Sequence, residues 1–500
     1  MAVSRTTDPK HNWRLRFHLQ TETGDITDPN GLCQLDGTYH FFHQHRRLWP
    51  DAAHGWGHWA TRDFRTWEWL GTPIMPSCDL DKNGSYSGSS VVSDGMMWCY
   101  YTGNQLLEGD HDHDWAGRLA NEIVVVGDGK SFGPKHLVLG NDGYPSYCSC
   151  HVRDPKVWSQ GGSMHMMLGA RTRADSRGAI LCYSSPDGLV WTMEGSVTNL
   201  GGTPFGYMWE CPDRIALDGR EYLGTCPQGM AMASDPDDPS KLTCQNVHAA
   251  GYFPMEGTIL DVMHQDTGLM GADAPYAAID ASTFHDWDHG FDYYACQTLV
   301  DERGRTLLIG WMSLPHDAND VRPYDNPTTT WKGCLTVPRE LTRDARTGLI
   351  LQHPVKEFDD LRRSSQEMGH TATGFATELC PKVADVVVSG IRGDLAMTFG
   401  DFLTLTVADG IATLGFARTD AGTTAGQGRA IRRAAVDGIR DLRVIVDTSV
   451  LEIYLNDGAA VFSTRYFTED ETLPLAIHTT AEQATVYGME PLSIDYLVDR

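Results

Sequence analysis

Short runs of apolar and aromatic residues, each bounded by Gly, Asp, Asn or Pro, dominate roughly the first two thirds of the chain. Examples are TYHFFHQH (38–45), MMWCYYTGN (96–104), MHMMLGA (164–170) and TLLIGWM (306–312). Such runs predict β-strands that are joined by turns, and long helical periodicity is scarce. The pattern therefore predicts an all-β fold.

A weak internal repeat accompanies these strands. The segments ATRDFRTWEWLG (60–71) and YSSPDGLVWTMEG (183–195) share a polar turn that contains Asp, followed four residues later by Trp. A turn that leads into an aromatic strand, repeated within an all-β region, is typical of the radially repeated sheets of a propeller. A β-sandwich is the competing interpretation.

The pattern changes near residue 350. HPVKEFDDLRR (353–363) places Val355, Phe358 and Leu361 at three-residue spacing, which predicts one short helix. Beyond it the expected strands are more regular and less aromatic: VADVVVSGI (383–391), DFLTLTV (401–407), LRVIVDTSVLEIYLNDG (442–458) and AAVFSTRYF (459–467). Alternation in LEIYLN, followed by Asp-Gly and another apolar run, predicts a hairpin. We expect an N-terminal domain over 1–345, a helical connector over 346–364 and a β-sandwich over 365–500.

Length and charge narrow the possible functions. Five hundred residues exceed one hydrophobic core, so two domains are expected. A net charge of −26 disfavours nucleic acid and anionic lipid as partners, although it allows a neutral small molecule. Residues 1–20 lack the apolar run of a signal peptide, and the twelve cysteines are scattered without framework spacing. We therefore expect a cytoplasmic protein with reduced thiols.

Three acidic residues lie in motifs that could orient them. Asp28 lies in TDPNG (27–31), where a tight turn is the simpler interpretation. Asp154 lies in VRDP (152–155), where a surface ion pair would suffice. Glu210 lies in WECPD (209–213), and apolar neighbours favour the neutral carboxyl that a general acid requires.

Together the three acids supply the minimum for hydrolysis of a glycosidic bond. One carboxylate attacks the anomeric carbon, a second carboxyl protonates the leaving oxygen, and a third binds ring hydroxyls in the transition state. Their wide separation along the chain suits a propeller, because each sheet sends a strand to a common centre. A retaining enzyme would hold the carboxyls of Asp28 and Glu210 about 5–5.5 Å apart.

The motifs resemble glycoside hydrolase family 32, which contains invertases, sucrose-phosphate hydrolases and fructanases. TDPNG, RDP (153–155) and EC (210–211) are similar to the family's nucleophile, stabiliser and acid/base motifs. Further landmarks occur in family order: GWGHW (55–59), YSGS (86–89), GFDYYACQT (290–298), GWM (310–312), LTVPREL (335–341), DTSVLEIYLNDG (447–458) and STRYF (463–467). The resemblance extends across nearly the whole chain.

The resemblance implies a five-bladed β-propeller, which would be the catalytic domain, followed by a C-terminal β-sandwich. It also implies that Asp28 is the nucleophile, Glu210 the acid/base and Asp154 the residue that holds fructose hydroxyls. The implied sugar-binding residues are Thr27, Gln44, Trp49, Ser87, Arg153, Cys211, Tyr294 and Trp311. Trp49 and Trp311 would supply apolar faces for the sugar, with core packing as the alternative, and Cys211 would tune Glu210.

One departure from the family concerns specificity. Asp25-Ile26-Thr27 replaces the usual Trp-Met-Asn, and a Thr hydroxyl offers fewer hydrogen bonds than an Asn amide. A basic cluster of His43, His45, Arg46 and Arg47 suggests the hypothesis that a phosphorylated glucose is tolerated, although salt bridging on an acidic protein would also explain it.

The expected function is retaining, exo-acting hydrolysis of terminal fructose from sucrose or short fructo-oligosaccharides. The alternatives are a sucrose-6-phosphate hydrolase, a fructosyltransferase on the same scaffold and a non-catalytic sugar-binding protein. Neither a cofactor nor a metal is implied, and we interpret EGDHDHDW (108–115) as a solvated loop. The leaving group and the oligomeric state stay open.

Overall fold

A computed structural model describes residues 13–47, 53–199, 203–230, 241–263, 277–315, 331–418, 425–426 and 428–497. Strands make up most of these residues, so the prediction of an all-β fold is confirmed. In this part of the chain no helix is long and apolar enough to cross a bilayer.

Within the described residues, the strands up to Pro354 form five sheets. The first contains β1 (Gly24–Leu35), β2 (Thr38–Arg46), β3 (Gly55–Thr61) and β4 (Thr66–Trp69), and β20 (Trp331–Lys332) pairs with β1 in parallel. The second contains β5 (Ser85–Ser93), β6 (Met96–Leu106), β7 (Arg118–Gly127) and β8 (His136–Leu139). The third contains β9 (Cys148–Gln160), β10 (Ser163–Thr172), β11 (Gly178–Ser185), β12 (Thr192–Thr198) and β16 (Ala277–Ala278).

The fourth sheet contains β13 (Met208–Leu217), β14 (Arg220–Gln228), β15 (Gly251–Pro254) and β17 (His285–Asp286). The fifth contains β18 (Tyr294–Val300), β19 (Thr306–Trp311), β21 (Arg339–Arg343) and β22 (Ile350–Pro354). Helical turns between the strands are short: η1 (Asp79–Asp81), η2 (Asn141–Gly143), α1 (Ile259–Met263) and η4 (Ala281–Thr283).

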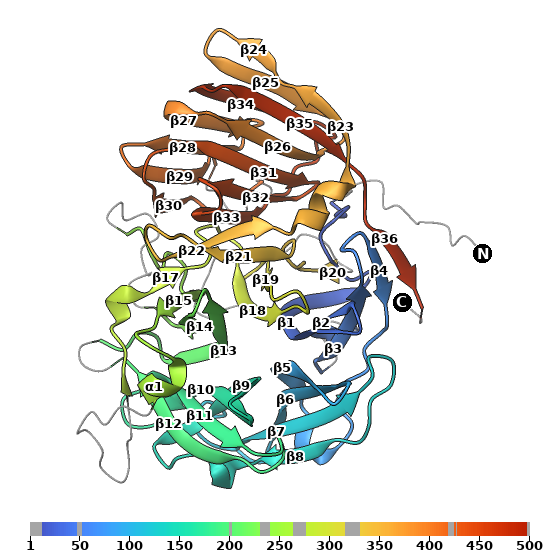
Figure 1. Cartoon of the computed structure of the whole chain (residues 1–500), viewed down its shortest axis with the longest axis vertical. Coiled ribbons are helices and arrows are strands. Elements are labelled where there is room, and N and C mark those ends of the chain that lie inside the picture. The colour runs from blue at the N-terminus through green and yellow to red at the C-terminus, as the bar shows by residue number, and fades with distance from the viewer. Residues whose placement is uncertain are drawn as a thin grey trace.

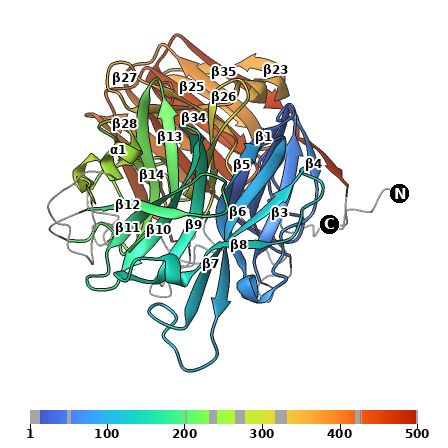
Figure 2. The same cartoon turned by 60° about the horizontal axis from the view of Figure 1, so that its bottom comes forward.

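The first strands of these sheets lie next to one another. β1 contacts β5, β5 contacts β9, β9 contacts β13, β13 contacts β18, and β18 contacts β1 again. Figure 2 shows β1, β5, β9 and β13 in this order. The ring is consistent with a propeller and brings five inner strands to one centre.

The internal repeat corresponds to one kind of turn. Asp63 accepts hydrogen bonds on Oδ1 from the backbone N–H groups two and three residues later, at 2.9 and 2.7 Å, between β3 and β4. Asp187 does the same between β11 and β12, at 2.9 and 3.0 Å, and Asp128 between β7 and β8, at 2.9 and 2.8 Å. Such side-chain-capped turns join the third strand of each of these sheets to the fourth, so the repeat is structural.

The C-terminal strands form two sheets packed face to face. One contains β23 (Arg362–Glu367), β26 (Val383–Ser389), β31 (Asp441–Asp447), β32 (Val450–Leu455), β33 (Ala460–Arg465) and β35 (Gln483–Met489). The other contains β24 (Gly369–Thr371), β25 (Gly374–Leu379), β27 (Arg392–Phe399), β28 (Leu403–Ala408), β29 (Ile411–Phe416), β30 (Ile431–Ala435) and β34 (Leu473–Thr480).

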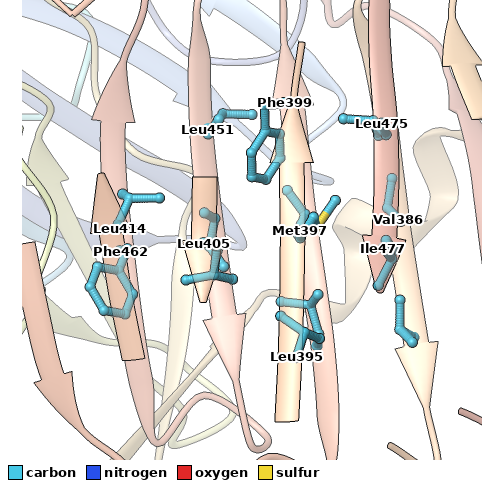
Figure 3. Packing of buried hydrophobic residues seen from close by; sticks show 14 of the residues in the cluster. Val386, Leu395, Met397, Phe399, Leu405, Leu414, Leu451, Phe462, Leu475 and Ile477 are labelled. Carbon is cyan, nitrogen blue, oxygen red and sulfur yellow. The ribbon is translucent and has the colours of Figure 1, made fainter. Parts of the chain in front are cut away.

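Alternating side chains fill the space between these two sheets. Leu395, Met397 and Phe399 of β27 point inward at every second position, as strand geometry requires, and meet Val386 and Leu451 of the opposite sheet (Figure 3). Full burial of one such side chain stabilises the fold by about 1.5–3 kcal/mol. The prediction of a C-terminal β-sandwich is consistent with this core.

The segment 346–364, which was expected to be a helical connector, is only partly helical in the structure. Its first part is strand β22, which pairs with β21, and only η5 (Lys356–Leu361) is helical, as a 3₁₀-helix. The three-residue spacing of Val355, Phe358 and Leu361 matches the 3.0 residues per turn of a 3₁₀-helix, and all three side chains are buried.

The last strand corrects the expected sandwich boundary. β36 (Ser493–Tyr496) pairs in parallel with β4 of the first sheet (Figure 1). Ile494 and Tyr496 pack against the apolar cluster that contains Trp67 and Trp69. The prediction that the sandwich extends over 365–500 is therefore wrong for its final strand.

Buried charges join the two halves of the chain. The backbone N–H groups of Arg16, Phe17 and His18 donate to the Asp447 carboxylate at 2.8, 3.0 and 3.1 Å. Burial disfavours the His18 cation, but Asp447 and Glu452, each 2.9 Å from a ring nitrogen, raise the pKa of His18 to about 9. Because a buried charge is tolerated only when it is paired, these contacts hold the sandwich on the ring of sheets.

Candidate active site

The inner strands are irregular at the centre of the ring. The strand pairing shifts at two points along β1 and β9 and at one point along β5, β13 and β18. On three of them a non-glycine residue adopts a left-handed conformation: Asp154 (φ 66°), Cys211 (φ 45°) and Ala295 (φ 48°). Bulges of this kind redirect side chains, and backbone strain of this kind clusters at functional sites.

The residue before each of these positions points toward a common centre. Arg153, Glu210 and Tyr294 occupy this place on β9, β13 and β18. Arg153 donates from Nη2 and Nε to Glu210 Oε1 at 2.7 and 3.0 Å, and the Tyr294 hydroxyl donates to Glu210 Oε2 at 2.6 Å. Both carboxylate oxygens of Glu210 are thus held, while the side chain stays 15% exposed.

Asp154 lies behind this group and is buried. The Cys211 N–H, freed from strand pairing by the bulge, donates to Asp154 Oδ2 at 3.0 Å. Burial raises the pKa of Asp154, Arg153 opposes the rise, and the charges of Glu210 and Asp28 add to it. The three predicted acids are therefore close enough to influence one another.

Asp28 enters from β1. The Ser87 hydroxyl of β5 donates to Asp28 Oδ2 at 2.6 Å. Burial raises the pKa of Asp28 to about 6, against hydrogen bonds from Ser87 and Thr27, and the charge of Glu210 contributes to the rise. The TDPNG turn needs its glycine, because a Cβ at Gly31 (φ 54°) would lie 2.6 Å from the Trp56 ring.

Two of the predicted sugar-binding residues carry polar atoms without a partner among the described residues. Gln44 donates from Nε2 to Ser85 O at 2.9 Å, but its buried Oε1 accepts nothing. The buried indole N–H of Trp311 also donates to nothing. Since an unsatisfied buried polar atom costs about 1–3 kcal/mol, both atoms suit hydrogen bonds to a ligand. Trp49, also predicted to bind the sugar, lies outside the described residues.

The expected surroundings of Glu210 need correction. Trp209 is fully buried in the apolar cluster of Phe205 and Phe253, on the opposite face of β13 from Glu210. Strand alternation separates the two side chains, so the Glu210 carboxyl lies among polar groups and not in an apolar pocket.

Cys211 is placed to support the site and not to attack. A hydrogen bond with the Cys226 thiol favours the thiolate, but burial and the neighbouring carboxylates raise the pKa of Cys211 well above its usual value. Its thiol therefore stays neutral, and its backbone N–H makes the contact with Asp154.

The basic cluster at 43–47 does not present four free cations. Burial lowers the pKa of His43 to about 3 and also lowers that of His45, so both rings are neutral. Arg46 binds Asp25, with Nη2 2.7 Å and Nε 3.1 Å from Oδ2. The structure thus favours the salt-bridge interpretation for Arg46, and Asp25, part of the departure from the family motif, supplies the partner.

Sequence reasoning missed a polar chain behind Asp154. The Asp154 N–H donates to Thr102 Oγ1 at 3.0 Å, and the Thr102 hydroxyl donates to Glu122 Oε2 at 2.9 Å. Burial raises the pKa of Glu122 to about 8. The Tyr144 hydroxyl lies 2.9 Å from Ala120 O and 3.0 Å from Glu122 Oε1, and a protonated Glu122 supplies the second proton that these contacts need. The sequence signal that could have revealed this polar chain was the single acidic residue, Glu122, within the apolar run of β7.

Replacing Glu122 with glutamine tests this protonation. The raised pKa means that wild-type stability falls as pH rises from 4.5, the ordinary pKa, to about 8. Glu122→Gln mimics the neutral acid, so its Tm should match or exceed the wild-type Tm at pH 7.5 and lack that pH dependence. Glu122→Ala should lose about 1–3 kcal/mol, because Thr102 and Tyr144 lose their partner. Thermal unfolding at pH 5 and pH 7 is the measurement, and equal loss in both variants at pH 7, below the raised pKa, would show that Glu122 is ionised there.

The site thus contains three acids from three sheets at the centre of an all-β ring, and two of the acids are partly exposed. Such a set of carboxyl groups is typical of a glycoside hydrolase. Residues 18–354 match the model described as glycosyl hydrolases family 32 N-terminal domain, and residues 404–493 match that of the family 32 C terminal. The chain belongs to glycoside hydrolase family 32, and it is a glycoside hydrolase.

Several named proteins are similar in sequence to this chain over most of their length. The sucrose-6-phosphate hydrolase of Bacillus subtilis (strain 168) is 31% identical over 469 residues, which cover 91% of this chain and 89% of the relative. That of Salmonella typhimurium is 34% identical over 463 residues, which cover 90% and 88%. The solved structure of sucrose-6-phosphate hydrolase from Lactobacillus gasseri has a TM-score of 0.77 at 24% identity and covers 97% of this chain and 94% of that chain, which supports the fold.

Proposed function

We propose that the protein hydrolyses the glycosidic bond of terminal β-D-fructofuranosyl residues in sucrose, sucrose 6-phosphate or short fructo-oligosaccharides, with retention of configuration. The observation that carries the proposal is that Asp28, Asp154 and Glu210 come from three sheets and lie close enough for their charges to act on one another, each held by its own hydrogen bond. The names of the relatives, sucrose-6-phosphate hydrolase, support sucrose-type substrates.

The first step would form a covalent fructosyl-enzyme. The Asp28 carboxylate, held by Ser87, attacks the anomeric carbon while Glu210 donates a proton to the leaving oxygen. Asp154 binds ring hydroxyls more tightly as positive charge develops in the sugar ring.

The second step would release fructose. Glu210, now ionised, removes a proton from a water molecule, which attacks the anomeric carbon and frees Asp28. Arg153 and Tyr294 keep the Glu210 carboxylate in one orientation during both steps, since each holds a different oxygen. Gln44 Oε1 and the Trp311 indole N–H would bind sugar hydroxyls. Thr27, which hydrogen-bonds to Asp28, would offer the sugar fewer hydrogen bonds than the family's usual Asn.

The architecture that we propose is a five-bladed propeller followed by a β-sandwich. The closed ring of inner strands from five described sheets supports the count. The expected boundaries, 1–345 for the propeller and 365–500 for the sandwich, need adjustment: β22 belongs to the fifth sheet, β23 begins the sandwich at Arg362, and β36 pairs with the first sheet. A cytoplasmic location is supported by the twelve cysteines, which all lie in described residues and are free.

Product ratios on sucrose test the proposed function. Hydrolysis should release glucose and fructose in equal amounts, because every fructosyl-enzyme reacts with water. A deficit of fructose relative to glucose would indicate transfer to a sugar acceptor instead. The absence of released fructose on sucrose, sucrose 6-phosphate and 1-kestose would contradict the proposal and favour a sugar-binding protein. Initial rates of both products, measured enzymatically, decide between these results.

A further inference from the structure

Guanidinium groups gather at one edge of the site, on the side of Glu210. His151 lies two residues before Arg153 on β9, and Arg153 donates from Nη1 to His151 Nδ1 at 2.9 Å. Burial, together with the charges of Arg153, Arg118 and Arg171, lowers the pKa of His151 to about 2. The three cations thus lie around one neutral imidazole, which is one contact away from the arginine that holds Glu210.

Arg118 and Arg171 are not neutralised by acids. Arg118 donates from Nε to His113 O at 3.1 Å, and Arg171 donates from Nε to Ser176 Oγ at 3.0 Å. In the part of the chain that the structure describes, neither has a carboxylate within ion-pair distance. The chain holds 66 acidic residues against 40 lysines and arginines, so two unneutralised guanidinium groups that both act on His151 indicate a use for their charge.

Aromatic rings hold one of these groups in place. The guanidinium carbon of Arg171 lies 4.0 Å from the centre of the Trp115 ring and 4.8 Å from that of Tyr207. Ring faces attract the cation without cancelling its charge. Burial raises the pKa of the Tyr207 hydroxyl, the charge of Glu210 adds to the rise, and Arg171 opposes it, so Tyr207 lies within electrostatic reach of both.

One acid faces the same edge. Asp114 Oδ1 lies 3.3 Å from His151 Nε2, and its side chain is 63% exposed. Because Asp114 is well solvated, its charge is screened more strongly than charges inside the site. It leaves the positive charge of Arg118 and Arg171 largely available to a ligand.

We propose that Arg118 and Arg171 form an anion subsite for a phosphate group carried by the leaving sugar. This inference rests on the proposed function, in which Glu210 protonates the leaving oxygen and the leaving sugar therefore lies on the Glu210 side. Guanidinium groups suit a phosphate monoester because they bind it through paired hydrogen bonds. The phosphate is bound and not transferred, so the only bond that breaks in the substrate is the glycosidic bond.

Kinetics on two substrates test the subsite. Arg171→Gln and Arg118→Gln should each lower kcat/KM for sucrose 6-phosphate by about ten- to a hundredfold, chiefly through KM, because one charged hydrogen-bond partner is lost. Both variants should keep kcat/KM for sucrose within about threefold, because uncharged glucose forms no ion pair. Arg171→Lys keeps the positive charge but loses the paired N–H donors of the guanidinium group. Its kcat/KM for sucrose 6-phosphate should therefore lie between those of the wild type and Arg171→Gln. Glucose 6-phosphate should inhibit wild-type sucrose hydrolysis more strongly than glucose, and Arg171→Gln should remove the difference.

Arg47→Gln is the matched control, because Arg47 is an exposed arginine of the basic cluster at 43–47. An unchanged ratio of the two kcat/KM values in all the Arg118 and Arg171 variants would overturn the inference while the proposed function stands. A ratio that falls only in Arg47→Gln would place the phosphate at the other cluster and also overturn it. If the wild type hydrolysed neither sucrose nor sucrose 6-phosphate, the proposed function would be contradicted instead. If Arg171→Gln does not fold, the ratios of the two kcat/KM values in Arg171→Lys and Arg118→Gln still test the inference.

Discussion

Replacing Asp28 with alanine should lower turnover of sucrose by roughly 10,000-fold or more, because the variant loses the carboxylate that is proposed to form the fructosyl-enzyme. Wild-type kcat/KM should also fall as pH is lowered through about 6. Burial raises the pKa of Asp28 to about 6, and only the ionised carboxylate attacks. The measurements are initial rates of glucose release, with the pH profile taken on the wild type.

Two further variants show whether the loss of turnover is specific to the Asp28 carboxylate. Asp28→Asn keeps the shape of the side chain and the contact with Ser87, so its Tm should stay close to that of the wild type while activity is lost. Asp36→Asn alters an exposed acid in the turn after β1 and should leave activity unchanged. If Asp28→Asn retained more than a small fraction of turnover, the nucleophile would have to be another group.

Glu210→Ala should affect substrates unequally. Loss of the proton donor should slow sucrose hydrolysis by about 100- to 10,000-fold, since glucose is a poor leaving group. Fructosyl fluoride needs no proton to depart, so its first step should hardly change. The lost base leaves the fructosyl-enzyme without an activated water, so the intermediate should accumulate and azide should restore turnover. The comparison is sucrose against fructosyl fluoride, with and without azide.

The structure supplies a control for this experiment. The Tyr294 hydroxyl donates to Glu210 Oε2 and lies 3.2 Å from the backbone oxygen of Cys226, so Tyr294→Phe disturbs the carboxylate without removing it. It should therefore lower turnover of sucrose less than Glu210→Ala and show no rescue by azide. Equal loss on both substrates in Glu210→Ala, with no rescue, would assign the acid/base role elsewhere.

Local sequence singled out the three acids as candidates, although each motif also had a simpler interpretation and the roles came from the family resemblance. Asp28 and Asp154 precede Pro, and Glu210 and Cys211 precede another Pro, at positions where the strands bulge. Ser87 was named from a short motif and does contact Asp28. These residues are recognisable because a bulge or a tight turn restricts which residues fit, and that restriction acts over a few positions of the chain.

Other features could not be read in this way. The partner of Arg46 is Asp25, on the neighbouring strand and 21 residues earlier, so the sequence showed a basic cluster where the structure shows an ion pair. Glu210 was expected among apolar groups because Trp209 is adjacent in sequence, although strand alternation places the two on opposite faces. The last strand, β36, was assigned to the sandwich because sequence proximity does not report which sheet edge is free.

By itself the sequence determined the strands, the capped turns such as those at Asp63 and Asp187, and the three acidic motifs, because periodicity and turn chemistry are local. Only the tertiary structure decided which of these groups meet. Arg153 holds Glu210 across 57 residues, Tyr294 holds it across 84, and Arg118 and Arg171 act on His151 from two different sheets. The physical reason is that a hydrogen bond or an ion pair acts over a few ångströms of space, and the ring of inner strands sets those distances.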